Sequence, residues 1–378
     1  MTPRKPSAAC APRFRYALIG LVLLAWLSGC QPKEITTARF YLENQEWGRA
    51  LEQLEAAVQN HPNDAEAHFL LGVAYGHLAR FEEMNRAFKR ALELSDKYQP
   101  QIAAERERYW TEHYDQGLRR LRARDYSTAA AHFKRAVLID PTRYEAHKRL
   151  ALCYLNDNQP DKALFIYQRL LEKTPDDVDL LMAVSGLHFD QKHYDQAATT
   201  LERVLRLEPS HRDALLRLAR TYDAQGAAEK AEKTYEAGVR AFPHDSDLIF
   251  SYAVHRYRRG QYQQAIQLFQ QVLDLEPDHF EAVTNIGNAY LSLAETLRKQ
   301  LRATPHGRLT AEKIHQLKNR VILNYRRAIP YLEQALKLQP EDANLWRNLG
   351  IAYLNTGETK KGEEAFLRSE ELKTNASN

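Results

Sequence analysis

Beyond residue 30, small, large and helix-ending residues recur with a period of about 34 residues. Prolines stand at positions 141, 175, 209, 243 and 277. Twelve residues before each proline is an alanine, and eight before it an aromatic residue or leucine: Ala129, Ala163, Ala197, Ala231 and Ala265, then Phe133, Tyr167, Leu201, Tyr235 and Phe269. Small residues let helices approach closely, large ones fill the space between them, and proline ends a helix. Because no segment shows the alternation of a β-strand, the pattern predicts an all-α repeat protein.

The pattern resembles the tetratricopeptide repeat, a helix–turn–helix unit of about 34 residues with characteristic positions. The last complete unit carries Trp346, Leu349, Gly350, Tyr353 and Phe366 at these positions. The resemblance covers nearly all of residues 31–376. It implies a right-handed solenoid, in which stacked units bury a continuous core and present an extended concave surface.

We expect about nine units. Units one and two occupy residues 30–98, units three to seven 99–279, unit eight 280–342, and unit nine with a polar C-terminal cap 343–378. About 11 additional residues precede unit three and should lengthen its first helix. Roughly 29 additional residues separate the two halves of unit eight, and Pro330 should kink or restart its second helix.

Residues 1–29 have the three parts of a secretory signal peptide. Four cations and no acid are followed by an apolar stretch over residues 16–27 and by small residues 28–29. An uncleaved membrane anchor is the alternative, but this stretch is shorter than the roughly 20 residues that span a bilayer. The four cations account for the whole formal net charge of +4. Residues 30–378 are therefore neutral, which argues against a nucleic-acid partner.

The sequence Leu27-Ser28-Gly29-Cys30 resembles the lipobox of bacterial lipoproteins. The resemblance implies cleavage before Cys30, a diacylglycerol on its thiol and acylation of the new N-terminus. The alternative is an ordinary cleaved signal peptide with a chance cysteine. Gln31, in place of the Asp that retains such proteins in the inner membrane, favours the outer membrane.

No catalytic, metal or cofactor motif is present in the sequence. His188 and His193 are five residues apart, off a shared helix face, and His188 takes a position that usually holds a packed tyrosine. Cys153, in an apolar helical stretch, should be a buried small hydrophobic residue. Acidic residues in 174–179 and 243–247 precede helices and should cap them. We therefore expect no enzyme activity, metal or cofactor.

Protein binding is the function that the resemblance implies, through a groove lined by the first helix of each unit. In units five to seven, the groove positions hold Met182, Phe189, Leu216, Arg220, Phe250, Val254, Tyr257 and Arg258. This apolar and aromatic strip with interspersed arginines suits an extended or helical peptide. The alternative is that several of these residues only pack between neighbouring units.

Units eight and nine carry part of a second binding pattern. Asn285 and Asn288 stand in one unit, and Arg347 and Asn348 in the next. In related repeats, asparagines at the positions of Asn288 and Asn348 clamp the C-terminal carboxylate of a peptide. The basic residue expected earlier in unit eight is Thr284, so this clamp is incomplete.

The insertion in unit eight is strongly basic. Over residues 298–327 a single acid, Glu312, accompanies nine cations: Arg298, Lys299, Arg302, Arg308, Lys313, Lys318, Arg320, Arg326 and Arg327. This hairpin either contacts an anionic lipid, polysaccharide or protein, or is a solvated surface feature.

We therefore expect a lipid-anchored scaffold or adaptor at the bacterial cell envelope, in the outer membrane and facing the periplasm. It would bind proteins during assembly of an envelope, pilus or secretion complex. The alternative is a structural component of exopolysaccharide export that contacts polymer or lipid through the basic 298–327 hairpin.

Overall fold

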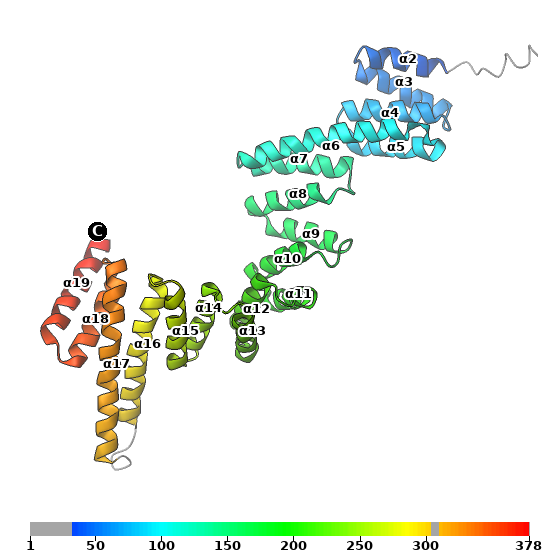
Figure 1. Cartoon of the computed structure of the whole chain (residues 1–378). Helices are drawn as coiled ribbons and strands as arrows, with labels where there is room; N and C mark the ends of the chain where they lie inside the picture. Colours follow the sequence, from blue (N-terminus) through cyan, green and yellow to red (C-terminus); the bar gives the residue numbers. More distant parts are fainter. Residues whose placement is uncertain (1–31, 304–309, 378) are drawn as a thin grey trace, which may run out of the picture. The chain divides into compact units, whose positions relative to one another are not determined.

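The computed structural model describes residues 32–303 and 310–377 (Figure 1). Within these ranges it contains eighteen α-helices, one short 3-10 turn and no strand. The predicted signal peptide, Cys30 and Arg308 lie outside the described residues. The chain divides into two compact units, Met1–Ile166 and Tyr167–Asn378. They are called the first unit and the second unit below, whereas single repeats keep their numbers, as in unit three or unit eight.

The helices follow one another as pairs, each pair forming one repeat. The first unit contains α2 (Lys33–Glu43), α3 (Trp47–Asn60), α4 (Ala65–His77), α5 (Phe81–Leu94), the turn η1 (Asp96–Tyr98), α6 (Gln99–Arg122), α7 (Tyr126–Ile139), α8 (Tyr144–Asn156) and the start of α9 (Pro160–Leu171). The second unit contains the end of α9, α10 (Val178–Asp190), α11 (Tyr194–Leu207), α12 (Arg212–Gln225), α13 (Ala228–Ala241), α14 (Ser246–Arg258), α15 (Tyr262–Leu275), α16 (Phe280–Ala303), α17 (Ala311–Leu338), α18 (Ala343–Thr356) and α19 (Thr359–Ser377). The described helices form nine pairs, from α2–α3 to α18–α19.

Aspartates begin several first helices of a pair. The Asp177 and Asp245 carboxylates accept backbone N–H groups of Leu180 and Leu248, each at 3.0 Å. These bonds satisfy N–H groups that the first helical turn leaves without partners. The predicted capping role of the acidic residues in 174–179 and 243–247 is confirmed for Asp177 and Asp245, whereas Asp176 and Asp247 pair with Arg203 and Arg212.

In eight of the pairs, the turn between the two helices contains one residue in the left-handed region. In the described residues these are Gln45, Ala79, Arg124, Asn158, Lys192, Gly226, Gly260 and Gly357, with φ between 55° and 92°. All eight occupy the same position of the repeat. The reversal of the chain is therefore the same in these units even where the residue has a side chain, which costs energy relative to glycine.

The small-to-large packing inferred from the repeat period is confirmed. All five predicted alanines are fully buried, and the five large residues that follow them are at most 7% exposed. A Cβ added to Gly72 of α4 would lie 2.3 Å from Phe88 of α5. The same relation holds across the insertion, where a Cβ on Gly287 would lie 2.9 Å from Leu332. These two pairs are thus held at a distance that leaves no room for a Cβ on the glycine.

Tyrosines on first helices connect successive repeats. Tyr75 donates to Glu55 at 2.9 Å, and Tyr353 donates to Glu333, in each case twenty residues earlier. Tyr222 makes the same bond to Glu202. Burial, and secondarily the carboxylate partner, raises the pKa of these phenols above the ordinary value.

Two regions depart from the standard length. α6 is extended to 24 residues, as the additional residues before unit three predicted. α16 and α17, with 24 and 28 residues, pack against each other as an antiparallel hairpin that reaches well beyond their neighbours (Figure 1). Of the two effects predicted for Pro330, the restart is wrong, because α17 continues through this residue, and the kink stays a prediction.

Candidate functional site

The predicted groove residues of units five to seven lie on α10, α12 and α14 of the second unit. Arg220 and Arg258 are exposed, and most of the others are half-buried. Leu216 is only 7% exposed and belongs to the core between helices. Met182 and Val254 pack against core clusters. For Leu216 the packing alternative is therefore correct. The surface accessible to a ligand includes fewer residues than the sequence pattern predicts.

An open pocket of about 320 Å³ lies between α10, α11 and α12. It contains two predicted groove residues, Phe189 and Arg220. Its remaining lining residues were not predicted: Ser185, Gly186, Asp190, Leu201, Arg217 and Thr221. Leu201, Ser185 and Thr221 are buried, and the two hydroxyls donate to backbone oxygens of their own helices. The groups that a ligand can reach are therefore the Phe189 ring and charges of both signs. Such a surface can bind a peptide side chain together with its polar backbone.

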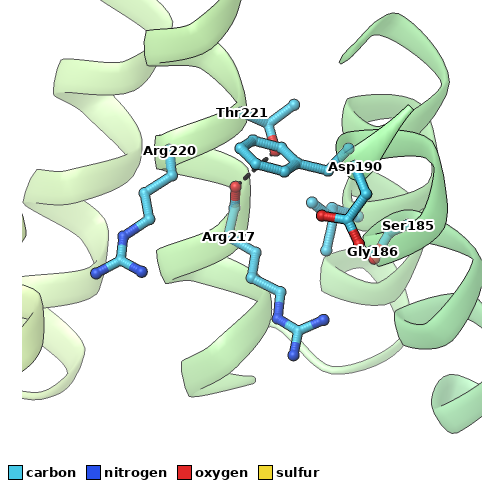
Figure 2. Close-up of a pocket in the computed structure, with 8 residues that line it drawn as sticks. Ser185, Gly186, Asp190, Arg217, Arg220 and Thr221 are labelled. Carbon is cyan, nitrogen blue, oxygen red and sulfur yellow. Dashed lines mark hydrogen bonds between the residues drawn. The ribbon is translucent and has the colours of Figure 1, made fainter. Parts of the chain in front are cut away.

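The two arginines of this pocket have different surroundings. The Arg220 guanidinium donates to the buried Ser251 hydroxyl of α14 at 2.8 Å, so it connects two repeats. Figure 2 shows Arg220 directed away from Asp190 and Arg217 extending beside the space between the two helices. A Cβ on Gly186 would lie 3.4 Å from the Arg217 side chain. Both arginines are exposed, but Arg220 is engaged by Ser251, so Arg217 is the arginine of this pocket that is better placed to meet a carboxylate.

Phe250 and Tyr257 are partly engaged by the neighbouring repeat. The Phe250 ring stacks on His279 at a centroid distance of 4.9 Å. The Tyr257 hydroxyl lies 3.3 Å from the Ser292 hydroxyl of α16. Each residue is half-buried, so part of its surface remains accessible on this face.

The asparagine pair of units eight and nine is brought together by the fold. Asn348 of α18 donates to the side-chain oxygen of Asn288 in α16 at 2.9 Å, although sixty residues separate them. Asn285 is half-buried, and Arg347 is exposed. The Thr284 hydroxyl is buried without a hydrogen-bond partner within the described residues. Asn288 and Asn348 thus have the proximity that a clamp requires, but they bond to each other.

The hairpin presents seven exposed cations within the described residues: Lys299, Arg302, Lys313, Lys318, Arg320, Arg326 and Arg327. Arg298, in contrast, is half-buried and donates to the Tyr325 hydroxyl at 3.1 Å. This bond raises the Arg298 pKa.

A buried histidine between repeats escaped the sequence analysis. His255 of α14 is 2% exposed, with Nδ1 2.6 Å from Asp223 and Nε2 3.2 Å from Glu232. An ionised carboxylate only accepts, so both contacts are hydrogen bonds when each ring nitrogen carries a proton. Tyr235 donates to Asp223 at 3.0 Å and Tyr252 to Glu232 at 2.6 Å. This His255 network joins α12, α13 and α14. In the sequence, the network was indicated only by a histidine at a repeat position that usually holds a small residue.

Other residues singled out in the sequence are structural. Burial raises the pKa of the Cys153 thiol to about 11, consistent with a buried small hydrophobic residue. Burial lowers the pKa of His188, which is 8% exposed. In the part of the chain that the structure describes, no group of three or more His, Cys, Asp or Glu side chains is arranged to hold a metal ion. Nor is any described helix both long and apolar enough to cross a membrane.

Models of the tetratricopeptide repeat match residues 35–99, 120–186, 188–249, 256–293 and 323–377. These matches together cover more than half of the chain, which therefore belongs to the tetratricopeptide-repeat proteins. Its predicted fold class, an all-α solenoid of such repeats, is confirmed.

Several solved structures are similar to this chain. One of MamA is 16% identical, with a TM-score of 0.43, covering 53% of this chain and 93% of MamA. YrrB, described as a TPR protein with an unusual peptide-binding site, is 16% identical, with a TM-score of 0.41, covering 55% and 91%. A tetratricopeptide repeat protein from Parabacteroides merdae is 15% identical, with a TM-score of 0.46, covering 65% and 99%. No curated protein matches the chain.

Proposed function

We propose that this protein is an adaptor that binds a segment of another protein on the first-helix face of its second unit. A lipid on Cys30 would hold it in the bacterial outer membrane, facing the periplasm. There it would contribute to the assembly of an envelope, pilus or secretion complex.

The pocket between α10, α11 and α12 is the observation that carries the binding proposal. The half-buried Phe189 ring offers apolar contact, and the exposed Arg217 guanidinium offers a charged donor for a carboxylate. A peptide with an apolar side chain next to an acidic one complements this lining. Phe250 and Tyr257 continue the aromatic surface on the following first helix.

A photo-crosslinking amino acid at position 189, followed by mass spectrometry, identifies what occupies the pocket in native envelopes. We expect a protein partner, and we expect Arg217→Glu to reduce its recovery about tenfold, because repulsion replaces a charge-assisted hydrogen bond. Arg206→Glu is the matched control, since Arg206 is exposed on α11 outside the pocket lining. Equal recovery with both variants would refute this site.

The lipid anchor rests on the sequence of residues 1–30 and needs its own test. Mass spectrometry of the mature N-terminal peptide should show Cys30 as the first residue, carrying a diacylglycerol. After Cys30→Ala the protein should be removed from membranes by a high-salt wash, which screens electrostatic contacts and leaves a lipid anchor in place. An unmodified N-terminal peptide would contradict the anchor without affecting the adaptor proposal.

A further inference from the structure

A second pocket, of about 390 Å³, lies at the base of the basic hairpin. It is formed by α16, α17 and Asn355 of α18. Three cations converge on it: Arg298, Arg302 and Lys318. Its other lining residues are apolar except Asn355, and none is acidic. The pocket therefore combines concentrated positive charge with an apolar wall.

Arg298 is held in place by groups that carry no full charge. Its Nη1 donates to the Tyr325 hydroxyl at 3.1 Å and to the Asn355 side-chain oxygen at 3.4 Å. Tyr325 is itself 2% exposed, so the guanidinium rests on a buried support. The acid nearest to Arg298 in the described residues is Glu295, whose oxygen lies 3.9 Å from Nε. This loose contact leaves much of the positive charge of Arg298 available to an anion.

Arg302 and Lys318 add positive charge from the two sides of the hairpin. Both side chains are exposed, and they come from α16 and α17 respectively. Further along α17, Arg320, Arg326 and Arg327 are exposed as well. An excess of cations on two adjacent helices raises the local concentration of anions and strengthens their binding.

The apolar part of the pocket distinguishes among anions. Leu301, Val321 and Ile322 line it, and Ile322 is 39% exposed. Leu323, the next residue, is 43% exposed. Large apolar side chains beside exposed cations are typical of surfaces that bind at the headgroup level of a membrane. A free polysaccharide or inorganic anion would leave them in contact with water.

We propose that this pocket binds the phosphate of an anionic phospholipid. Arg298, Arg302 and Lys318 contact the phosphate, while Leu301 and Ile322 contact the glycerol and the first methylenes of the acyl chains. The hairpin thereby forms a membrane contact that depends neither on a lipid at Cys30 nor on peptide binding at the α10–α12 pocket.

The test uses the full-length protein in a nonionic detergent and isothermal titration with three soluble probes. They are dihexanoyl-phosphatidylglycerol, dihexanoyl-phosphatidylcholine and inorganic phosphate. The phosphatidylcholine probe corrects for partition into detergent. We expect saturable binding of the phosphatidylglycerol probe and at least tenfold weaker binding of phosphate, which lacks the apolar part.

The double variant Arg302→Gln with Lys318→Gln should bind the phosphatidylglycerol probe at least about tenfold more weakly, because each cation contributes to attraction of an anionic lipid. The matched control, Lys233→Gln with Arg240→Gln, removes the same charge from α13 and should change nothing. Ile322→Ser should weaken the binding of the phosphatidylglycerol probe and leave the affinity for inorganic phosphate unchanged. Circular dichroism establishes that the variants are folded.

Three outcomes would overturn the proposal. Phosphate that binds as tightly as the lipid probe would indicate a free-anion site. Equal losses in the hairpin and control variants would indicate general charge attraction. Failure of the lipid probe to bind, while an acidic polysaccharide or acidic peptide binds with the same dependence on Arg302 and Lys318, would assign the hairpin to another class of partner.

Discussion

Replacing His255 by alanine tests the energetic role of the His255 network. The substitution removes both contacts of the ring, to Asp223 at 2.6 Å and to Glu232 at 3.2 Å. It leaves two carboxylates that are 20% and 17% exposed, each with fewer donors. The loss therefore falls on groups that water reaches only in part.

The magnitude follows from the number of bonds and their exposure. A hydrogen bond to a charged group contributes about 1.5–3 kcal/mol, and two of them are lost. Tyr235 and Tyr252 still donate to the two carboxylates, and water replaces part of the lost contacts. We therefore expect a destabilisation near the lower end of the sum, about 3 kcal/mol.

Repeat proteins open locally, so the assay must resolve individual helices. Native-state hydrogen exchange with mass spectrometry should show exchange in α12–α14 accelerated about 100-fold, the equivalent of ~3 kcal/mol. Exchange in α4 and α5 should not change. His244→Ala is the control, because His244 is exposed in the turn before α14.

The reasoning would be refuted if His255→Ala changed exchange in α12–α14 by less than about fivefold, equivalent to ~1 kcal/mol. Such a result would mean that desolvation of the charged groups cancels the hydrogen bonds of the network, as happens for some buried ion pairs. Equal acceleration in α4 and α5 would instead indicate global unfolding.

Three further predictions concern single elements. The Nδ1 atoms of His113 and His132 lie 3.2 Å apart, and burial lowers both pKa values below 6.5. Their contribution to stability is complete above pH 6.5 and is lost as the pH falls through the lowered pKa values. The urea midpoint of the first unit should therefore be lower at pH 5 than at pH 7, and the difference should be smaller after His132→Gln. Gly72→Ala should lower the free energy of unfolding by about 2 kcal/mol in a urea titration, because the new Cβ overlaps the Phe88 ring. The control Gly48→Ala, whose Cβ would have nothing within 4 Å, should raise this free energy by about 0.5–1 kcal/mol. Pro330→Ala should slow hydrogen exchange in α17 by an amount equivalent to about 1–3 kcal/mol, because it restores a backbone donor inside a continuous helix; unchanged exchange would show that the proline is not strained.

The repeat architecture was readable from the sequence because its determinants are local and periodic. Ala129 and Phe133, and their equivalents, recur once in every repeat and are buried as predicted. The capping aspartates and the extension of α6 were also readable, since each acts on its own helix. The restart predicted at Pro330 was wrong, because a proline rule derived from isolated helices does not include the packing of α17 against α16 and α18.

The candidate sites depended on contacts between repeats, which a single-unit pattern does not encode. Leu216 occupies a groove position yet is buried, since the adjacent helices cover it. Asn288 and Asn348 form a hydrogen bond although the insertion separates them in the sequence. Arg298 donates to Tyr325, a contact that counting charges along the sequence does not reveal. The sequence by itself determined the repeat and its core, because packing within each helix pair repeats with the residue spacing. Only the tertiary structure decided which polar side chains are free for a ligand, because each is paired or released by residues of the next repeat.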